Sequence, residues 1–340
     1  MPMDLSRRML LGQAGAAVAT AQAGRVLAAS PIPVHIANAS GSTNLVMTAL
    51  MRQQRFLESF GLDPDILNVG DGSKIVGGLL GGSLDASLMS GFGQVFPAIE
   101  RGAPIRVIGG GALLPLLAMF TGKPNIRTLK DLEGKTVGTG SVGALVYQLT
   151  ATLMRKYQVD IRKVRFVNIG SSADIIRAVA AGTIDAGAGD ASAITQAANR
   201  KIRLIEHGNM SVELTAYTYQ GAWTTVKKIA TNRDAIVRSL AAYGKLYRFV
   251  QQPQAKPAFL KALASAFPNA TPADADAHWN YIQTYKPFAV NLVLSPERMR
   301  YMQALNISFG VQKRIVPFEG VADMSLARDA LKLLGGPVKA

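Results

Sequence analysis

The sequence of 340 residues contains no cysteine, which excludes several kinds of chemistry at once. Without thiols there are no disulfide bonds, no thiolate metal sites and no cysteine nucleophile. A lipid anchor on an N-terminal cysteine is excluded as well. Histidine is scarce, and the three present (His35, His207 and His278) show neither the His-x-x-His nor the Glu-x-x-His spacing of a metal site.

Motifs that assemble a catalytic or polyanion-binding site are also missing. The chain has no Gly-x-Ser-x-Gly nucleophile elbow and no phosphate-binding loop. The formal net charge is +15, yet lysine and arginine never occur in runs longer than two. Nucleic-acid-binding domains gather their basic residues into a patch. We therefore expect no nucleic-acid partner, no catalytic residues, no metal and no cofactor.

The N-terminal segment predicts export. Ser6-Arg7-Arg8 precedes a weakly apolar stretch rich in Ala and Gly, and either Val26-Leu27-Ala28 or Ala21-Gln22-Ala23 offers the small residues that signal peptidases read. This pattern resembles a twin-arginine signal over residues 1–29, although the general export route and the cleavage site stay open. The stretch is too short and too rich in glycine to span a bilayer stably. We expect a soluble periplasmic protein without a lipid anchor.

Short apolar runs alternate with amphipathic stretches from Pro31 onward, which predicts β-α-β units and mostly parallel sheets. The expected strands span residues 34–37, 66–69, 86–89, 105–108, 135–138, 164–169, 184–187 and 202–205. The expected helices span residues 44–57, 73–80, 92–101, 142–157, 173–181 and 192–198. Residues 112–120 are expected to cross between the two halves. From about residue 218 the pattern is mainly helical, with a helix that Asn232 caps.

The two halves contain an internal repeat. Gly82-Ser83-Leu84-Asp85-Ala86 recurs as Gly182-Thr183-Ile184-Asp185-Ala186, each time between a helix and a strand. Ser40-Gly41-Ser42, after the first strand, is matched by Thr139-Gly140-Ser141. Agreement at both positions indicates two lobes of similar topology. We interpret Asp85 and Asp185 as structural residues at the strand starts.

Together with the Leu-x-Asp-Leu-x-Gly-Lys segment at 129–135, these motifs carry a family resemblance. The sequence resembles the solute-binding proteins of ABC importers for nitrate, sulfonate, taurine and thiamine precursors. The resemblance implies an α/β, two-lobed type II periplasmic binding-protein fold, each lobe a mostly parallel sheet flanked by helices, with a ligand cleft between the lobes. It places the first lobe at 30–115 and 218–340 and the second at 116–217.

In this fold the ligand lies at the carboxyl ends of the strands, where loop amides and helix N-termini point into the cleft. The resemblance therefore implies a ligand site made largely of small hydroxyl residues and glycines. The candidates are Ser40, Gly41, Ser42, Thr43, Asp71, Ser73, Ser90, Gly91, Thr139, Gly140, Ser141, Asn168, Ser171, Asp190 and Tyr217. Neutral donors of this kind suit an oxyanion.

Two of the candidates carry a carboxylate, which would favour an ammonium group on the ligand. Ser, Thr, Asn and Asp are also the preferred helix N-caps, so each polar candidate has a purely structural interpretation. If Asp71 or Asp190 faces the cleft, the ligand carries an ammonium group; if both cap helices, a purely anionic ligand is favoured. Tyr217 and Tyr219 are expected to alternate on one strand, so that only one of them reaches the cleft.

These expectations converge on transport. The chain is expected to be a monomeric periplasmic protein that closes on a small, anionic organic solute and delivers it to the permease of an ABC importer. A ligand-sensing periplasmic protein and a TRAP-type binding protein are the alternatives from the same fold. A thiamine-pyrimidine synthase loses its main support because such enzymes need a cysteine-rich segment.

Overall fold

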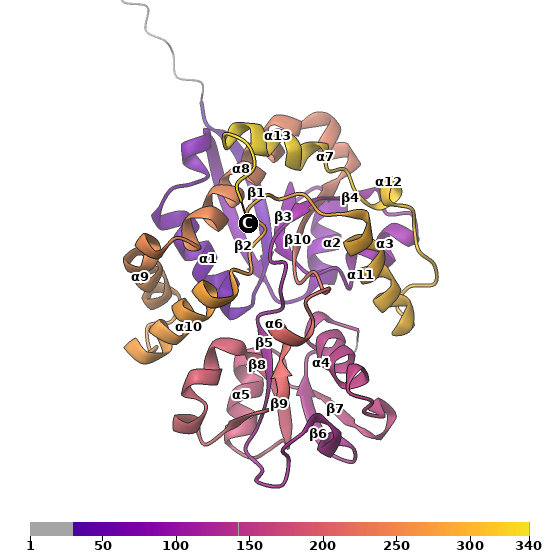
Figure 1. Cartoon of the computed structure of the whole chain (residues 1–340). Coiled ribbons are helices and arrows are strands. Elements are labelled where there is room, and N and C mark those ends of the chain that lie inside the picture. Colours follow the sequence, from indigo (N-terminus) through magenta and orange to yellow (C-terminus); the bar gives the residue numbers. More distant parts are fainter. Residues whose placement is uncertain (1–29, 142, 340) are drawn as a thin grey trace, which may run out of the picture. The chain divides into compact units, whose positions relative to one another are not determined.

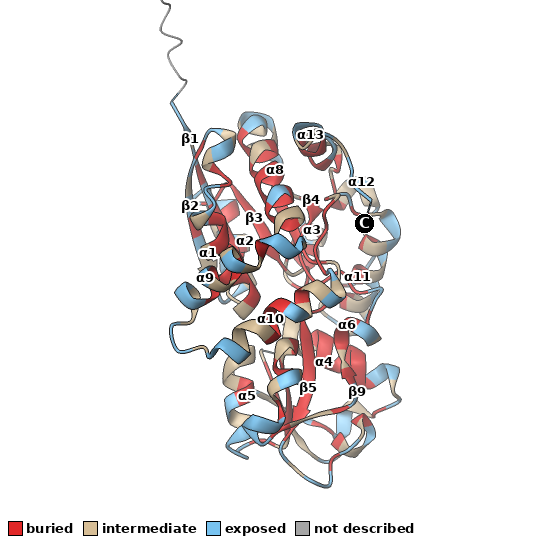
Figure 2. Cartoon of the chain, turned by 60° about the vertical axis from the view of Figure 1, so that its left-hand side comes forward, coloured by how far each residue is buried: buried red, intermediate tan, exposed pale blue. Residues whose placement is uncertain are grey.

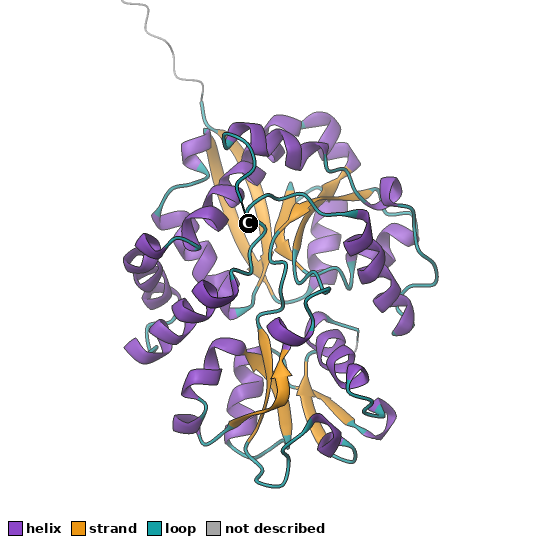
Figure 3. Ribbon diagram, in the orientation of Figure 1, coloured by secondary structure: helices purple, strands orange, loops and turns teal. Residues whose placement is uncertain are grey.

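The computed structural model describes residues 30–141 and 143–339. The expected export signal, residues 1–29, lies outside the described residues. From Pro31 onward the chain forms one compact unit. Figures 1 and 3 show two groups of strands in this unit, each flanked by helices. Within the described residues, no helix combines the length and the hydropathy that a membrane span requires.

The first sheet has five strands in the order β2-β1-β3-β10-β4. Its strands are β1 (Ile32–Ala39), β2 (Leu62–Val69), β3 (Ala86–Ser90), β4 (Ile105–Gly110) and β10 (Gly221–Thr225). β1 pairs in parallel with β2 and β3, whereas β10 is antiparallel to β3 and β4. Four of the five strands thus run the same way. We call this sheet with the helices packed on it the first lobe.

The second sheet has the order β7-β6-β8-β5-β9. Its strands are β5 (Leu117–Thr121), β6 (Thr136–Thr139), β7 (Arg165–Asn168), β8 (Ala186–Asp190) and β9 (Arg203–Asn209). β6 is parallel to β7 and β8, and β5 is antiparallel to β8 and β9. The exceptions β5 and β10 are the first strands after each crossing of the chain, and they occupy the same position in their sheets. The predicted two-lobed fold with mostly parallel sheets is thus confirmed; we call the second sheet with α4, α5 and α6 the second lobe.

Helices connect and cover the strands. The α-helices are α1 (Ser42–Gln53), α2 (Gly72–Gly81), α3 (Val95–Glu100), α4 (Leu145–Lys156), α5 (Ser172–Ala180), α6 (Met210–Glu213), α7 (Val226–Thr231), α8 (Arg233–Val250), α9 (Lys256–Ala266), α10 (Pro272–Tyr285), α11 (Pro296–Ser308), α12 (Phe318–Val321) and α13 (Ser325–Leu333). Short 3-10 turns include η4 (Ala191–Gln196) and η5 (Ala198–Arg200). Figure 2 shows buried residues along the strands and on the helix faces turned towards them.

The aspartates of the repeated pentapeptides make the same hydrogen bonds in both lobes. The Asp85 carboxylate accepts the backbone N–H of His35 at 2.7 Å, and the Asp185 carboxylate accepts that of Thr136 at 2.8 Å. In each case the backbone N–H of the aspartate also bonds to the carbonyl of the same residue, at 2.8 Å and 3.0 Å. Asp85 therefore fixes the start of β3 against β1, and Asp185 fixes the start of β8 against β6, as the structural interpretation predicts.

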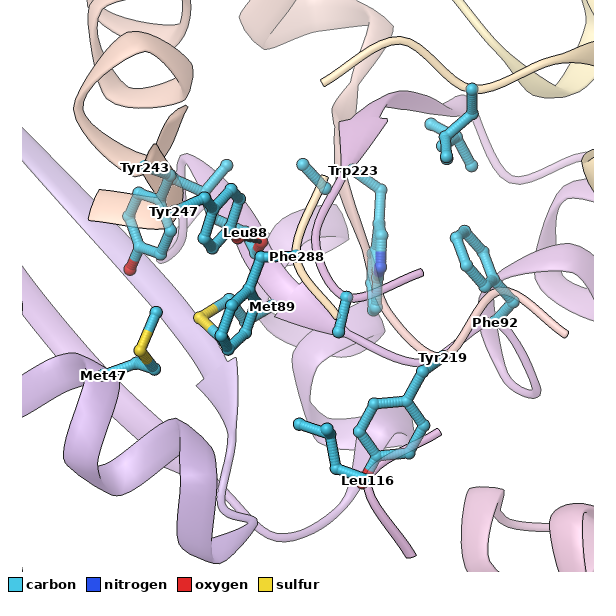
Figure 4. Packing of buried hydrophobic residues seen from close by; sticks show 14 of the residues in the cluster. Met47, Leu88, Met89, Phe92, Leu116, Tyr219, Trp223, Tyr243, Tyr247 and Phe288 are labelled. Atoms are coloured by element: carbon cyan, nitrogen blue, oxygen red, sulfur yellow. Dashed lines mark hydrogen bonds between the residues drawn. The ribbon is translucent and has the colours of Figure 1, made fainter. Parts of the chain in front are cut away.

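Aromatic side chains fill the core of the first lobe (Figure 4). Trp223 of β10 and both tyrosines of α8, Tyr243 and Tyr247, are buried. The rings of Tyr247 and Phe288 are stacked, with centroids 5.4 Å apart. The hydroxyl of Tyr243 accepts a 2.7 Å hydrogen bond from the Asn38 amide in β1. These contacts fix α8 against the sheet and join the C-terminal helices to the N-terminal strands.

Several local predictions need correction. The helix expected from residue 142 begins at Leu145, because Gly143 adopts a left-handed φ of 81° that a helix cannot continue through. The helix expected at 192–198 is instead two 3-10 turns. Asn232 lies between α7 and α8, and its side chain makes no capping bond. The apolar crossing segment 112–120 ends in strand β5.

The strand expected around Tyr217 and Tyr219 is also wrong. At Gln220 the chain bonds to residues 111 and 112: the Gln220 N–H donates to the carbonyl of Ala112, and the Gln220 carbonyl accepts the N–H of Gly111, each at 2.9 Å. Strand β10 begins one residue later. Both tyrosines are buried, so the alternation that would turn one side chain out and the other in does not apply.

Candidate functional site

Polar residues from both lobes line one cavity of about 430 Å³. The first lobe contributes Ser42, the first residue of α1. The second lobe contributes Ser172, the first residue of α5, and Asp190, the last residue of β8. The other lining residues are Ala173, Ile176, Arg177, Ser192, Ala193, Arg200, Leu263, Ala266, Phe267, Pro268, Asn269, Ala270, Asp274 and His278. Figure 2 shows α10 between α9 and α5.

The start of α1 lies at this cavity through Ser42 and has no side-chain cap. Gly41 is the N-cap residue in an extended conformation, and no side chain caps the helix. The first N–H groups of an α-helix have no partner within the helix. They also carry the positive end of the helix dipole. This end of α1 is therefore suited to an anionic or strongly electronegative group.

The start of α5 differs because side chains cap it. Ser171 accepts the N–H of Asp174, and the Asp174 carboxylate accepts the N–H of Ser171, which is a capping box. The Ser171 hydroxyl donates to the same carboxylate at 2.5 Å. Ser171 thus serves the helix, and its neighbour Ser172 is the residue that lines the cavity.

Helix α10 connects the two lobes around the cavity. His278 Nε2 lies 3.0 Å from the hydroxyl of Thr43 in the first turn of α1. On the other side, Arg200 of the second lobe pairs with Asp274 at 2.6 Å. The Tyr281 hydroxyl donates to Asn209 at the end of β9, at 2.9 Å. One wall of the cavity is therefore built by an element that touches both lobes.

Ionisation at the cavity follows from these contacts. Burial opposes the charge on Asp274, but hydrogen bonds from Thr271 and Arg200 outweigh it and lower the pKa of the carboxyl. Burial raises the pKa of the Tyr219 hydroxyl, and the negative charge of Asp190 raises it further. Burial also raises the pKa of Tyr281, with Asp190 contributing in the same direction. Both tyrosines therefore stay neutral around Asp190.

A second group of expected residues lies at the ends of β6 and β7. The Asn168 amide donates to the Ser141 hydroxyl at 3.1 Å, and the Thr139 hydroxyl donates to the carbonyl of Gly140 at 2.9 Å. These residues do not line the cavity. The glycines at 138, 140 and 143 also have dinucleotide-loop spacing, which sequence reasoning overlooked. However, β7 ends in Asn168 and not in the acidic residue that holds a ribose.

The expected first-lobe residues are spread more widely. The Asp71 carboxylate caps α2 by accepting the N–H of Ser73 at 2.8 Å, and both residues are exposed away from the cavity. The Ser90 hydroxyl is buried and accepts a 2.7 Å bond from Ser87. A Cβ on Gly91 would lie 3.3 Å from the second-lobe side chain of Leu145. Gly91 is therefore at a contact between lobes.

Of the remaining expected residues, some lie at the cavity and others do not. The N–H of Ser40 continues the pairing of β1 by bonding to the carbonyl of Val69 at 3.2 Å, next to the uncapped Gly41. Tyr217 is only 1% exposed, and its buried hydroxyl has no partner among the described residues. It does not line the cavity. Asp190 both caps η4 and lines the cavity, so its two interpretations are compatible.

Sequence reasoning missed the contribution of α9 and α10. Leu263, Phe267, Asp274 and His278 line the cavity, but none was a candidate. The sequence shows where α10 begins, through its capping box at Thr271 and the proline after it. It contains no signal for the partner on which that helix packs.

Comparison with known proteins agrees with this architecture. The family model described as "NMT1/THI5 like" matches residues 44–256. The alkanesulfonate-binding protein SsuA from Xanthomonas axonopodis pv. citri, solved with MOPS bound, is 18% identical with a TM-score of 0.70, covering 86% of this chain and 99% of that one. SsuA from Escherichia coli is 17% identical with a TM-score of 0.70, covering 86% and 92%. The predicted resemblance is thus confirmed.

The same fold also occurs with other functions. The nitrate-binding protein NrtA from Synechocystis PCC 6803 is 10% identical with a TM-score of 0.64, covering 89% of both chains. The desulfurization enzyme DszB is 13% identical with a TM-score of 0.64, covering 89% of this chain and 99% of that one. No curated protein sequence matches the chain. At these identities the likeness establishes the fold, and the ligand must be argued from the residues.

Proposed function

Since this chain belongs to the NMT1/THI5-like family and has the fold of ABC-importer solute-binding proteins, we propose that it is a periplasmic binding protein. It takes up a small organic solute with an acidic group and delivers it to the permease of an ABC importer. The observation that carries this proposal is the 430 Å³ cavity, because residues of both lobes line it. Its size lies in the range of roughly 300–1,000 Å³ that is usual for organic ligands.

The start of α1 supports an acidic group on the solute. Its first N–H groups and the Ser42 hydroxyl are neutral donors at a helix end whose first residue lines the cavity. Such donors hold an oxyanion through charge-assisted hydrogen bonds. They also leave no buried cation behind when the solute departs. A sulfonate or carboxylate suits this end of the cavity.

The positions of the lining residues support lobe closure as part of this proposal. The polar contacts between the lobes include the Gln148 amide donating to Asn306 at 2.8 Å and, at the cavity itself, the ion pair of Arg200 with Asp274. A solute bound between Ser42 and Asp190 adds contacts that exist only when the lobes are together. It therefore stabilises the closed state in proportion to those contacts. The permease would then distinguish the closed, loaded form from the open one.

Binding without turnover is part of the proposal, and we expect the protein to act as a monomer. A thermal-shift screen of the mature protein with sulfonates, carboxylates, nitrate and thiamine pyrimidines tests it directly. A ligand at about one hundred times its dissociation constant adds about 2.7 kcal/mol, a shift of several degrees. The bound compound should be recovered unchanged from the complex by mass spectrometry.

A matched pair of variants locates the site. Ser42→Trp places an indole in the cavity and is expected to abolish the ligand-induced shift. Ser73→Trp is the control, because Ser73 also lies in the first turn of a helix but is exposed outside the cavity. Equal ligand shifts in both variants would contradict the cavity as the site. Absence of any shift in the wild-type protein, or conversion of the ligand, would contradict the function.

A further inference from the structure

Asp190 keeps one carboxylate oxygen free at the cavity. Its Oδ1 accepts the N–H of Ser192 at 3.0 Å and the Ser192 hydroxyl at 2.7 Å. Its Oδ2 has no donor within the described part of the chain. This oxygen is not among the buried side-chain atoms that lack a partner, so it remains accessible. Half of the carboxylate therefore supports η4, and the other half faces open space at a cavity that Asp190 lines.

The other charged groups of the cavity are already paired. Arg177 forms an ion pair with Asp174, and Arg200 forms one with Asp274 at 2.6 Å. In residues 30–141 and 143–339, Asp190 takes part in no ion pair. Although the protein as a whole carries a formal charge of +15, the unpaired charge at this cavity is negative. Burying that charge beneath a ligand is unfavourable unless the ligand supplies a positive partner.

Part of the cavity lining is apolar, and we call it the apolar wall. It consists of Ile176 of α5, Leu263 of α9 and Phe267 just after α9. These side chains have no polar atoms to offer, so the part of a ligand that lies against them gains by being apolar. A nitrate-sized anion occupies little more than the roughly 30 Å³ of one water molecule and leaves most of the cavity unfilled.

From these observations we infer that the cavity is specific for an organic solute with a protonated amine, held by the Asp190 carboxylate, next to an apolar body that packs against Ile176, Leu263 and Phe267. The inference rests on the proposed function and narrows it. The acidic group of the solute lies at the start of α1, and the amine lies at the end of β8. The solute is then a zwitterion with an apolar part, and an analogue without the amine leaves Asp190 desolvated and unpaired.

Isothermal titration calorimetry with matched compounds tests the inference. Each pair differs only in the amine: phenylalanine with 3-phenylpropanoate, 6-aminohexanoate with hexanoate, and 2-aminoethanesulfonate with ethanesulfonate. A hydrogen bond to a charged group makes the amine member of the fitting pair bind roughly ten- to a hundredfold more tightly. Of the three pairs, the phenyl pair is expected to bind most tightly, because its ring covers the apolar wall.

Asp190→Asn should abolish the advantage of the amine and leave the amine-free member unchanged or slightly tighter. Asparagine is as good an N-cap as aspartate, so η4 should persist. Asp71→Asn is the matched control, because Asp71 caps α2 in the same way outside the cavity; it should keep the full advantage. Asp190→Ser, another N-cap residue, should reproduce Asp190→Asn.

The outcomes separate this inference from the proposed function. If the acids bind and the amine adds nothing, or if its advantage survives in Asp190→Asn, the inference is wrong and the binding-protein function stands. If no compound of either kind binds, both are wrong. Loss of all binding in Asp190→Asn and Asp190→Ser, with unchanged melting temperatures, would assign Asp190 to the acid end and overturn the amine assignment.

Discussion

Asp85 and Asp185 have the same place in the two lobes, but only Asp85 carries a buried ion pair. Lys228 Nζ lies 2.5 Å from the Asp85 carboxylate, whose side chain is 5% exposed, and the lysine side chain is 23% exposed. Within the described residues, Asp185 accepts the N–H of Thr136 without a cation beside it. Replacing either aspartate by asparagine keeps an acceptor for the backbone N–H. Only Asp85→Asn leaves a lysine without its partner.

The expected magnitudes differ accordingly. Removing one partner of a fully buried ion pair costs about 3–5 kcal/mol, and the partial exposure of Lys228 reduces this to about 2–4 kcal/mol. Asp185→Asn weakens one hydrogen bond and should cost about 1 kcal/mol. Urea unfolding followed by far-UV circular dichroism measures both. Tryptophan fluorescence adds a local signal for Asp85→Asn, because Trp223 lies in β10, next to β3.

A double-mutant cycle isolates the charge pair from other effects of the substitution. In a Lys228→Met protein the Asp85 carboxylate is already uncompensated, so adding Asp85→Asn should cost little or even stabilise. An equal loss in the wild-type and Lys228→Met backgrounds would refute the ion pair as the cause. Equal losses for Asp85→Asn and Asp185→Asn in the wild-type background would refute the argument from burial.

Two further predictions concern closure and pH. A Cβ on Gly93 would lie 3.1 Å from the carbonyl oxygen of Gly143 in the other lobe. Gly93→Ala should therefore weaken ligand binding roughly tenfold in calorimetry, with little change in the melting temperature of the unliganded protein. Gly77→Ala is the control, because its added Cβ lies in open space and should leave the affinity unchanged; an equally unchanged affinity in Gly93→Ala would contradict the prediction. Although burial opposes the charge, hydrogen bonds from Lys156, Tyr157 and His207 lower the pKa of Glu213 to about 2. The ionised Glu213 carboxylate stabilises the fold fully above the ordinary pKa of about 4.3, and this effect is lost as the pH falls towards 2. In urea titrations, the free energy of unfolding of the wild type should therefore exceed that of Glu213→Gln by less and less between these two pH values. A constant difference would contradict this.

Local patterns in the sequence were sufficient to predict the two lobes. Apolar runs of four to six residues between glycines and helix caps indicated most strands, and the pentapeptide around Asp85 and Asp185 indicated the repeat. The crossing strand β5 was not recognised because all its residues are buried. A strand buried on both faces has no alternation of polar and apolar residues, and its sequence therefore resembles any apolar connection.

The site was less predictable than the fold. Ser42 and Asp190 follow or end strands whose carboxyl ends face the other lobe, and that topological rule brought them into the candidate list. The same rule selected Asp71, which caps a helix at the surface, and Ser73, whose backbone N–H that carboxylate accepts. Capping and ligand binding use the same residue types, so only the packing of neighbouring elements separates them. The wall formed by α9 and α10 depends on long-range packing that no local pattern encodes.

The variants Asp190→Asn and Gly93→Ala probe two different contributions to the same affinity. Asp190 contacts one end of the cavity, so its substitution changes the preference between ligands with and without an amine. A Cβ on Gly93 would lie against Gly143 and Gln148 of the second lobe, and Gly93 does not line the cavity, so we expect its substitution to lower the population of the proposed closed state. A smaller closed population weakens every ligand by the same factor. Recognition and closure can therefore be separated with one set of ligands, because only a change in their ranking reports on Asp190.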